Sequence, residues 1–251
     1  HLFYAWVSAT QKLSVGNMDY IKHHIAFNDK MKYYFGNMKG HKWTEEDIEL
    51  KNGCKLISKS NVAGIRGGSK LHKRYDLIIL DDFEHEQNTI TRDARDKNSN
   101  LVTAVVFPAL EPHTGRLRIN GTPVHYDSFI NRLLVGYAKA QSDKADFAWK
   151  VITHKARSKD GTILWESFFT DKILKERKKF YIDSGQPHKY YQEYFMEVQS
   201  EEDSIWTRSH IEYWKGYYKR EDNNNFLTIE GEDIPVNIFI GCDPATDIYR
   251  V

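Results

Sequence analysis

The sequence has little that would place it outside a reducing compartment or inside a membrane. It contains only two cysteines, Cys54 and Cys242, which lie far apart and cannot form the disulfide framework of a small secreted protein. Its longest apolar stretch, Leu101 to Leu110, includes a Thr and a Pro and is about half as long as a membrane span. These absences predict a cytosolic protein that does not cross a bilayer.

The sequence also lacks an excess of charge of either sign. It has 36 Lys and Arg residues against 35 Asp and Glu residues, for a formal net charge of +1. Proteins that bind nucleic acid usually carry a basic footprint, so any DNA site on this chain has to be local. The amino terminus has no initiator Met, basic signal region or cleavage site, and we therefore expect a piece of a longer protein.

What is present fits an ordinary globular protein. A chain of 251 residues buries roughly 70% of its unfolded surface, and 40% apolar residues supply the core. Apolar patterning predicts strands and helices that alternate along the first 150 residues, which favours an α/β fold with a parallel sheet. We expect strands at 2–7, 76–82, 116–120 and 149–153, helices at 15–35, 88–109 and 126–139, and a hairpin turn at Asn52-Gly53.

The pattern changes in the last hundred residues. A basic helix is expected at 171–181, and a Tyr-rich stretch follows at 190–195. Acidic and Asn-rich runs between Gln199 and Asn225 are typical of a linker, because few contacts cross such segments. The last expected strand, 236–242, ends at Asp243.

The strand at 76–82 carries the clearest chemical pattern. Four aliphatic residues precede Asp81 and Asp82, as in a Walker B element, where a buried strand delivers acidic residues at its carboxyl end. In such ATPases the first carboxylate holds Mg²⁺ and a neighbouring one polarises the attacking water. Asp81 fits the first role and Asp82 the second, with Glu84 as the alternative for the second. The pattern fits equally well a strand that ends in a polar loop.

A phosphate-binding loop is missing from the sequence. Residues 64–70 imitate one, but their glycine spacing is wrong, Leu71 stands where Ser or Thr is required, and a strand is expected after them. We interpret the segment as a turn, in which Arg66 is a candidate contact for a phosphate or a neighbouring subunit.

Five short landmarks, taken in order, resemble the large subunit of tailed-virus DNA-packaging terminases over nearly the whole chain. They are Ser8-Ala9-Thr10, Gly64-Ile65-Arg66-Gly67 leading into 76–82, Gly121-Thr122-Pro123, Leu164-Trp165-Glu166 and Gly241-Cys242-Asp243-Pro244-Ala245. The resemblance implies a P-loop ATPase core at 1–158 without its first strand, a helical subdomain at 159–200, a linker at 201–235, and the start of an RNase H-like nuclease domain at 236–251.

The resemblance also implies roles for further residues. Gly121 and Thr122 correspond to the coupling motif, which senses the phosphate state, although Thr122 alone also fits a helix start with Pro123 in the first turn. Asp243, assisted by Asp247, corresponds to the first metal-binding carboxylate of the nuclease. The remaining nuclease carboxylates are expected beyond Val251, so this fragment is expected to be inactive as a nuclease, and without a phosphate loop also as an ATPase.

The intact protein is thus expected to hydrolyse ATP with Mg²⁺, to translocate viral double-stranded DNA into the procapsid, and to cut concatemeric DNA as a metal-dependent endonuclease. The implied partners are DNA, the portal protein, a small terminase subunit and further copies of the chain, in the host cytoplasm at the procapsid portal. Two alternatives stay open: another P-loop ATPase such as a helicase-like protein, and a non-enzymatic DNA-binding or scaffold protein. Helicases place Ser-Ala-Thr after the Walker B strand, whereas here it comes before.

Overall fold

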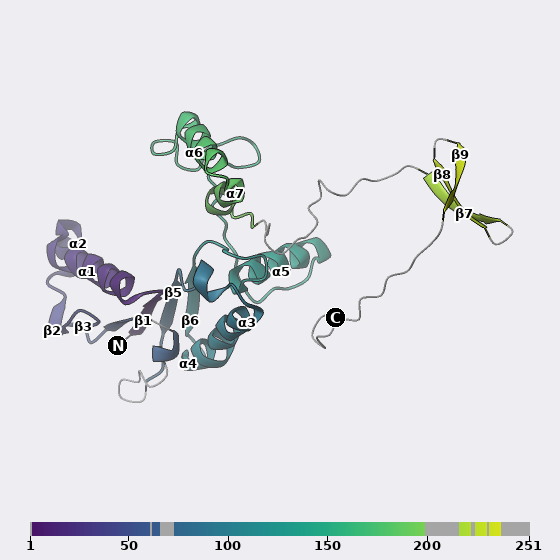
Figure 1. Ribbon diagram of the computed structural model, residues 1–251. Coiled ribbons are helices and arrows are strands. Elements are labelled where there is room, and N and C mark those ends of the chain that lie inside the picture. The colour runs from purple at the N-terminus through teal and green to yellow at the C-terminus, as the bar shows by residue number, and fades with distance from the viewer. Residues whose placement is uncertain are drawn as a thin grey trace. The chain divides into compact units, whose positions relative to one another are not determined.

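The computed structural model describes residues 2–60, 62–65, 73–198, 216–221, 224–229 and 231–236 (Figure 1). The chain forms two compact units, residues 1–200 and 201–251. Arg66, Asp243 and Asp247 lie outside the described residues, as does the expected strand 236–242 apart from Val236.

The first unit is built on a mixed, mostly parallel sheet of six strands in the order β2-β3-β4-β1-β5-β6. Strands β1, β5 and β6 lie side by side in Figure 1, and all their pairings, like that of β1 with β4, are parallel. The parallel strands are β1 (Phe3–Ser8), β4 (Lys55–Lys59), β5 (Leu77–Asp81) and β6 (Arg116–Asn120), and the antiparallel ones are β2 (Lys39–Trp43) and β3 (Asp47–Leu50). The α/β fold class is thereby confirmed.

The hairpin at Asn52-Gly53 is confirmed, with a different turn. Strands β3 and β4 pair in antiparallel fashion on either side of it. Gly53 has a φ of 82°, whereas Asn52 keeps a negative φ. The connection is therefore the four residues between Leu50 and Lys55, and not a two-residue turn with positive φ at both positions.

The helix expected at 15–35 is two helices, α1 (Gln11–Phe27) and α2 (Asp29–Phe35). The Asn28 side chain accepts hydrogen bonds from the N–H groups of Lys30 (3.0 Å) and Met31 (3.2 Å). Asn is a strong N-cap, because its side chain replaces the missing helical acceptor. Capping by Asn28 thus begins a second helix where the apolar pattern predicted continuity.

The segment expected as one helix at 88–109 changes its winding twice. It forms the short 3₁₀ turn η2 (Glu86–Asn88), the helix α3 (Arg92–Leu101), the π-helix η3 (Val102–Val106) and the short α4 (Phe107–Ala109). Helix α5 (Phe129–Asp143) follows β6, and a 3₁₀ turn, η1 (Val62–Ile65), follows β4. The buried core of the unit packs the sheet against η3 and α5, with Ile78, Leu80 and Val106 fully excluded from solvent.

The prediction of a strand at 149–153 is wrong, because these residues form no strand. Trp149 packs against the core instead, with its ring 6.1 Å from that of Phe129. Its apolar character therefore reflects packing on α5. Helix α6 (Asp171–Asp183) confirms the basic helix expected at 171–181, and the Tyr-rich stretch 190–195 lies in a second helix, α7 (Pro187–Phe195).

The second unit contains an antiparallel sheet in a region expected to be a linker. Its strands are β7 (Gly216–Glu221), β8 (Asn224–Ile229) and β9 (Glu232–Val236). Polar side chains pair across the strands: Lys219 forms an ion pair with Asp233, and Asn225, from the Asn-rich run that had indicated a linker, accepts a hydrogen bond from the Tyr218 hydroxyl. In the part of the chain that the structure describes, no helix is both long and apolar enough to cross a membrane.

Candidate functional site

The parallel strands bring their carboxyl ends to one rim of the sheet. Ser8 of β1 pairs with Asp81 of β5, and Asp81 pairs with Asn120 of β6. Neighbouring strands are about 4.8 Å apart, so Asp82 and the Gly121-Thr122 turn follow directly at the same rim. The expected placement of Asp81, Asp82 and Thr122 on one edge is confirmed.

Asp81 is held in place by helix α1. The Asn17 side-chain nitrogen lies 3.2 Å from both the Asp81 Oδ2 and the Ser8 Oγ, and donates to them. A single amide thus bridges the ends of β1 and β5. Asn17 could not be predicted from the sequence, because a polar residue within a helix carries no local signal of what it faces.

Asp82 has an unusual backbone conformation. Its φ of 48° lies in the left-handed region, which Asp and Asn tolerate better than other non-Gly residues. Its N–H donates to the carbonyl of Asn120 at 3.0 Å, which ties the end of β5 to the end of β6. Although the residue reaches solvent, desolvation raises the pKa of its carboxyl group, and the neighbouring Asp81 raises it further.

Two adjacent carboxylates that repel each other are a setting in which a divalent cation is stabilising. Mg²⁺ prefers oxygen ligands, binds through one or two carboxylates, and keeps several waters. Asp81 and Asp82, with the Ser8 hydroxyl nearby, offer that donor set at the rim. No group of three or more metal-binding side chains occurs among the described residues, so water or a substrate phosphate would have to complete the coordination.

Glu84 takes a different position from Asp82. It is 3% exposed, and its Oε1 and Oε2 accept hydrogen bonds from the N–H groups of Phe129 (2.8 Å) and Ile130 (2.9 Å) at the start of α5. Burial raises the pKa of Glu84, while the hydrogen bonds from Ile130 and Phe129 act in the opposite direction. Both oxygens are therefore engaged with α5, away from the adjacent carboxylates of the rim.

The Gly121-Thr122-Pro123 turn is not a helix start. Helix α5 begins at Phe129, with Ser128 as its N-cap, so the alternative interpretation of Thr122 is wrong. A Cβ atom at Gly121 would lie 3.0 Å from the Ile130 Cδ1 and 3.4 Å from the Asp82 Oδ1. The turn is therefore packed closely between Asp82 and α5, with little room for a larger residue.

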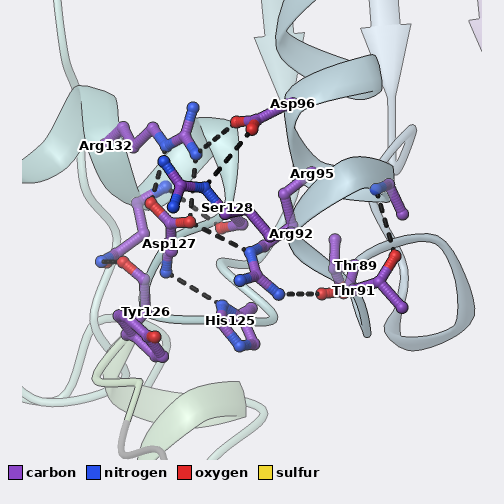
Figure 2. A network of polar contacts seen from close by, with 12 residues as sticks. Thr89, Thr91, Arg92, Arg95, Asp96, His125, Tyr126, Asp127, Ser128 and Arg132 are labelled. Atoms are coloured by element: carbon purple, nitrogen blue, oxygen red, sulfur yellow. Dashed lines mark hydrogen bonds and ion pairs between the residues drawn. The ribbon is translucent and has the colours of Figure 1, made fainter. Parts of the chain in front are cut away.

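A polar network that the sequence did not predict fixes Asp127, at the far end of the loop 121–127 that begins with this turn (Figure 2). The Asp127 carboxylate accepts from the Arg95 Nε at 3.1 Å and from the Arg132 Nε at 2.8 Å. Arg95 is 6% exposed and also donates to the carbonyl of Thr89 at 2.8 Å. Arg132 reaches on to Asp96 of α3 at 3.0 Å. The network joins α3 to the start of α5 through Asp127.

The network predicts how stability changes at acidic pH. The hydrogen bond from Arg132 lowers the pKa of Asp127 below its usual value of 3.8, with a further contribution from Arg95. A lowered folded-state pKa contributes stability that is present above the unfolded value and is lost as pH falls through the folded one. We expect Asp127→Asn to lower the free energy of unfolding at pH 7, and the difference from wild type to shrink below about pH 4. Urea unfolding at pH 7 and at pH 3 measures this. An undiminished difference at pH 3 would contradict it.

Helix α7 brings charged groups to the segment that follows β5. The Lys189 Nζ lies 2.8 Å from the Glu86 Oε1. Burial raises the pKa of Glu193, with smaller contributions from Glu86 and from Asp82, so Glu193 lies within electrostatic reach of the rim. The sequence predicted only a Tyr-rich stretch at 190–195, and no local pattern there indicated this contact.

The comparisons with known proteins add no relative. A scan against protein-family models found no match, and a search of curated proteins found none either.

Proposed function

We propose that this chain is part of a terminase large subunit, comprising the ATPase core that follows the phosphate loop and the start of the nuclease domain. One observation carries the proposal. An acidic pair ends a central parallel strand, and a Gly-Thr-Pro turn ends the adjacent strand in contact with it. In α/β sheets ligands bind at this rim, beyond the carboxyl ends of the strands.

Each residue of the rim has a part in the proposed reaction. Asp81, oriented by Asn17, would hold Mg²⁺, and Asp82 would orient and polarise the water that attacks the terminal phosphate. Bound Mg²⁺ neutralises charge on the phosphates. Thr122 and Gly121 lie beyond β6, where their hydroxyl and backbone groups would sense whether the phosphate is present.

The assignment of the water-polarising role to Asp82 follows from where the two candidates lie. Asp82 adjoins Asp81 on the rim and is exposed to solvent, where an attacking water can reach it. Glu84 is buried with both oxygens bound to α5. A carboxylate that already accepts two backbone N–H groups is poorly placed to bind a water as well.

In the intact protein, ATP hydrolysis would drive viral double-stranded DNA into the procapsid, and the nuclease would cut concatemeric DNA with Mg²⁺ at Asp243 and Asp247. The partners would be the portal protein, a small terminase subunit and further copies, at the procapsid portal in the host cytoplasm. Arg66 would contact a phosphate or a neighbouring subunit.

Two other functions compete. A helicase-like ATPase would use the same acidic rim, but the Ser-Ala-Thr segment here ends β1, ahead of the Walker B strand in sequence. A non-enzymatic DNA-binding or scaffold protein would not need two adjacent carboxylates at a strand end. Such a protein would bind DNA, and it would not bind ATP even in a longer form of the chain.

Hydrolysis by a longer form tests the proposal. We expect the 251-residue chain not to turn over ATP, because no backbone cradle for the phosphates is present in its sequence. A form that carries a phosphate-binding loop upstream of His1 should hydrolyse ATP with Mg²⁺, as measured by phosphate release. Absence of nucleotide binding and hydrolysis in that form would reject the ATPase assignment.

A further inference from the structure

The short segment from Asp82 to Glu84 touches both ends of the loop that carries Thr122. At the near end, the Asp82 N–H donates to Asn120, the last residue of β6. At the far end, Glu84 accepts from the first residues of α5. Between these contacts lies the loop 121–127. Two residues of chain beyond Asp82 therefore span the full length of that loop.

The first turn of α5 has all three of its N–H groups paired, by two different residues. Helix amino termini leave their first N–H groups without intrahelical acceptors. Glu84 accepts from Phe129 and Ile130, whereas Ser128, the local N-cap, accepts from Asn131 at 3.3 Å. Ser128 thus stabilises the helix locally, and Glu84 connects the same turn to the end of β5.

The hydrogen bonds between Glu84 and the first turn of α5 are costly to break. A buried carboxylate without partners is strongly unfavourable, so Glu84 and the α5 N–H groups hold each other in place. Negative charge is also favourable at a helix amino terminus. The preceding Phe83 is 6% exposed and packs with its ring 6.3 Å from that of Phe129, which fixes the segment between the rim and Glu84.

We infer that Glu84 is a positioning residue, which sets the loop 121–127, and with it Thr122, at a fixed place relative to Asp82. The inference rests on the proposed function for its role in hydrolysis. The Asp127 network holds the same loop from the side of α3 (Figure 2), so the end of the loop at α5 is anchored to two separate elements. Glu84 is the anchor that leads directly to the acidic rim.

Amide exchange in the 251-residue chain tests the anchor without any assay of activity. The variant Glu84→Gln keeps one acceptor but turns an NH₂ group toward the second helix N–H. We expect exchange of the Phe129 and Ile130 amides to speed up by about tenfold, with faster exchange through 121–127. Ser128→Ala is the matched control, because it removes a cap from the same turn. It should affect Asn131 and leave the loop unchanged.

The role of Glu84 in hydrolysis is tested by the kinetics of the form that carries a phosphate-binding loop. We expect Glu84→Gln to lower kcat by about tenfold and to change KM less than about twofold, since a displaced loop impairs the reaction more than binding. Ser128→Ala, assayed well below its Tm, should keep the parent kcat.

The outcomes separate the possible roles. Unchanged exchange in 121–127 for Glu84→Gln overturns the positioning inference, whether or not any form hydrolyses ATP. Faster exchange with the same kcat as Ser128→Ala shows that Glu84 only stabilises α5. Unchanged exchange with complete loss of hydrolysis makes Glu84 the water-polarising group. Failure of the parent form to hydrolyse ATP rejects the proposed function alone, because the exchange measurements still decide the anchor.

Discussion

Asp82→Asn should lower kcat for the proposed ATP hydrolysis by about 100-fold or more in a form that carries a phosphate-binding loop, because the amide cannot accept a proton from the attacking water. The substitution keeps the size of the side chain, and Asn also tolerates the left-handed backbone found at φ 48°. We therefore expect the Tm and the affinity for ATP to stay close to those of the parent. Phosphate release under saturating ATP measures the effect.

The controls for Asp82 lie at its two neighbours. Asp81→Asn should raise the Mg²⁺ concentration needed for hydrolysis, since Asp81 is assigned to the cation. Glu84→Gln should reduce kcat far less than Asp82→Asn does. An unchanged rate in Asp82→Asn together with complete loss in Glu84→Gln would transfer the role to Glu84, and would mean that the buried carboxylate leaves α5 during the reaction.

We expect Asp243→Ala to abolish the proposed DNA cleavage by the full-length protein and to spare its proposed ATPase activity. The expectation comes from the sequence alone, in which the apolar run 236–242 ends at Asp243 and repeats the sequence pattern of β5 after a polar region. Two-metal nucleases need several carboxylates around ions about 4 Å apart, so loss of one central ligand is severe. Conversion of supercoiled plasmid to nicked and linear forms with Mg²⁺ or Mn²⁺ measures cleavage.

The same chemistry predicts that the 251-residue chain neither cleaves DNA nor holds two metal ions at the nuclease site, because Asp243 and Asp247 alone are too few carboxylates to hold two ions about 4 Å apart. Asp247→Ala, a change at the assisting position, should reduce cleavage less than Asp243→Ala. Full nicking activity in Asp243→Ala, or loss of ATPase activity with it, would show that the site and the domain boundary are misplaced.

Local patterns in the sequence were sufficient for the elements that their own residues define. The strand ending in Asp81 was predictable because four consecutive aliphatic residues suit a strand covered on both faces. The strand at 116–120 and the hairpin beside Gly53 were also predictable. The break at Asn28 was missed, because a cap acts through one hydrogen-bonded side chain and leaves the apolar period nearly unchanged.

The predictions that were wrong are those in which the apolar or polar character of a segment was taken as a sign of local structure, although it reflects contacts with distant residues. Trp149 looked like part of a strand, although it packs on Phe129 without any strand pairing. The region 201–235 looked like a linker because it is polar, although β7, β8 and β9 pair within it. Composition reports which side chains are present, and pairing depends on which backbone groups find partners.

The sequence by itself determined that an acidic pair ends a buried strand and that a Gly-Thr-Pro turn follows another, since both are local patterns. Only the tertiary structure decided that the two lie in contact at one rim, because strand order depends on pairing between distant segments. It also separated Asp82 from Glu84. The two carboxylates are only two residues apart, and the sequence does not distinguish their roles. In the structure the turn after β5 leaves Asp82 beside Asp81. It buries Glu84 against the first N–H groups of α5, which have no acceptor within the helix.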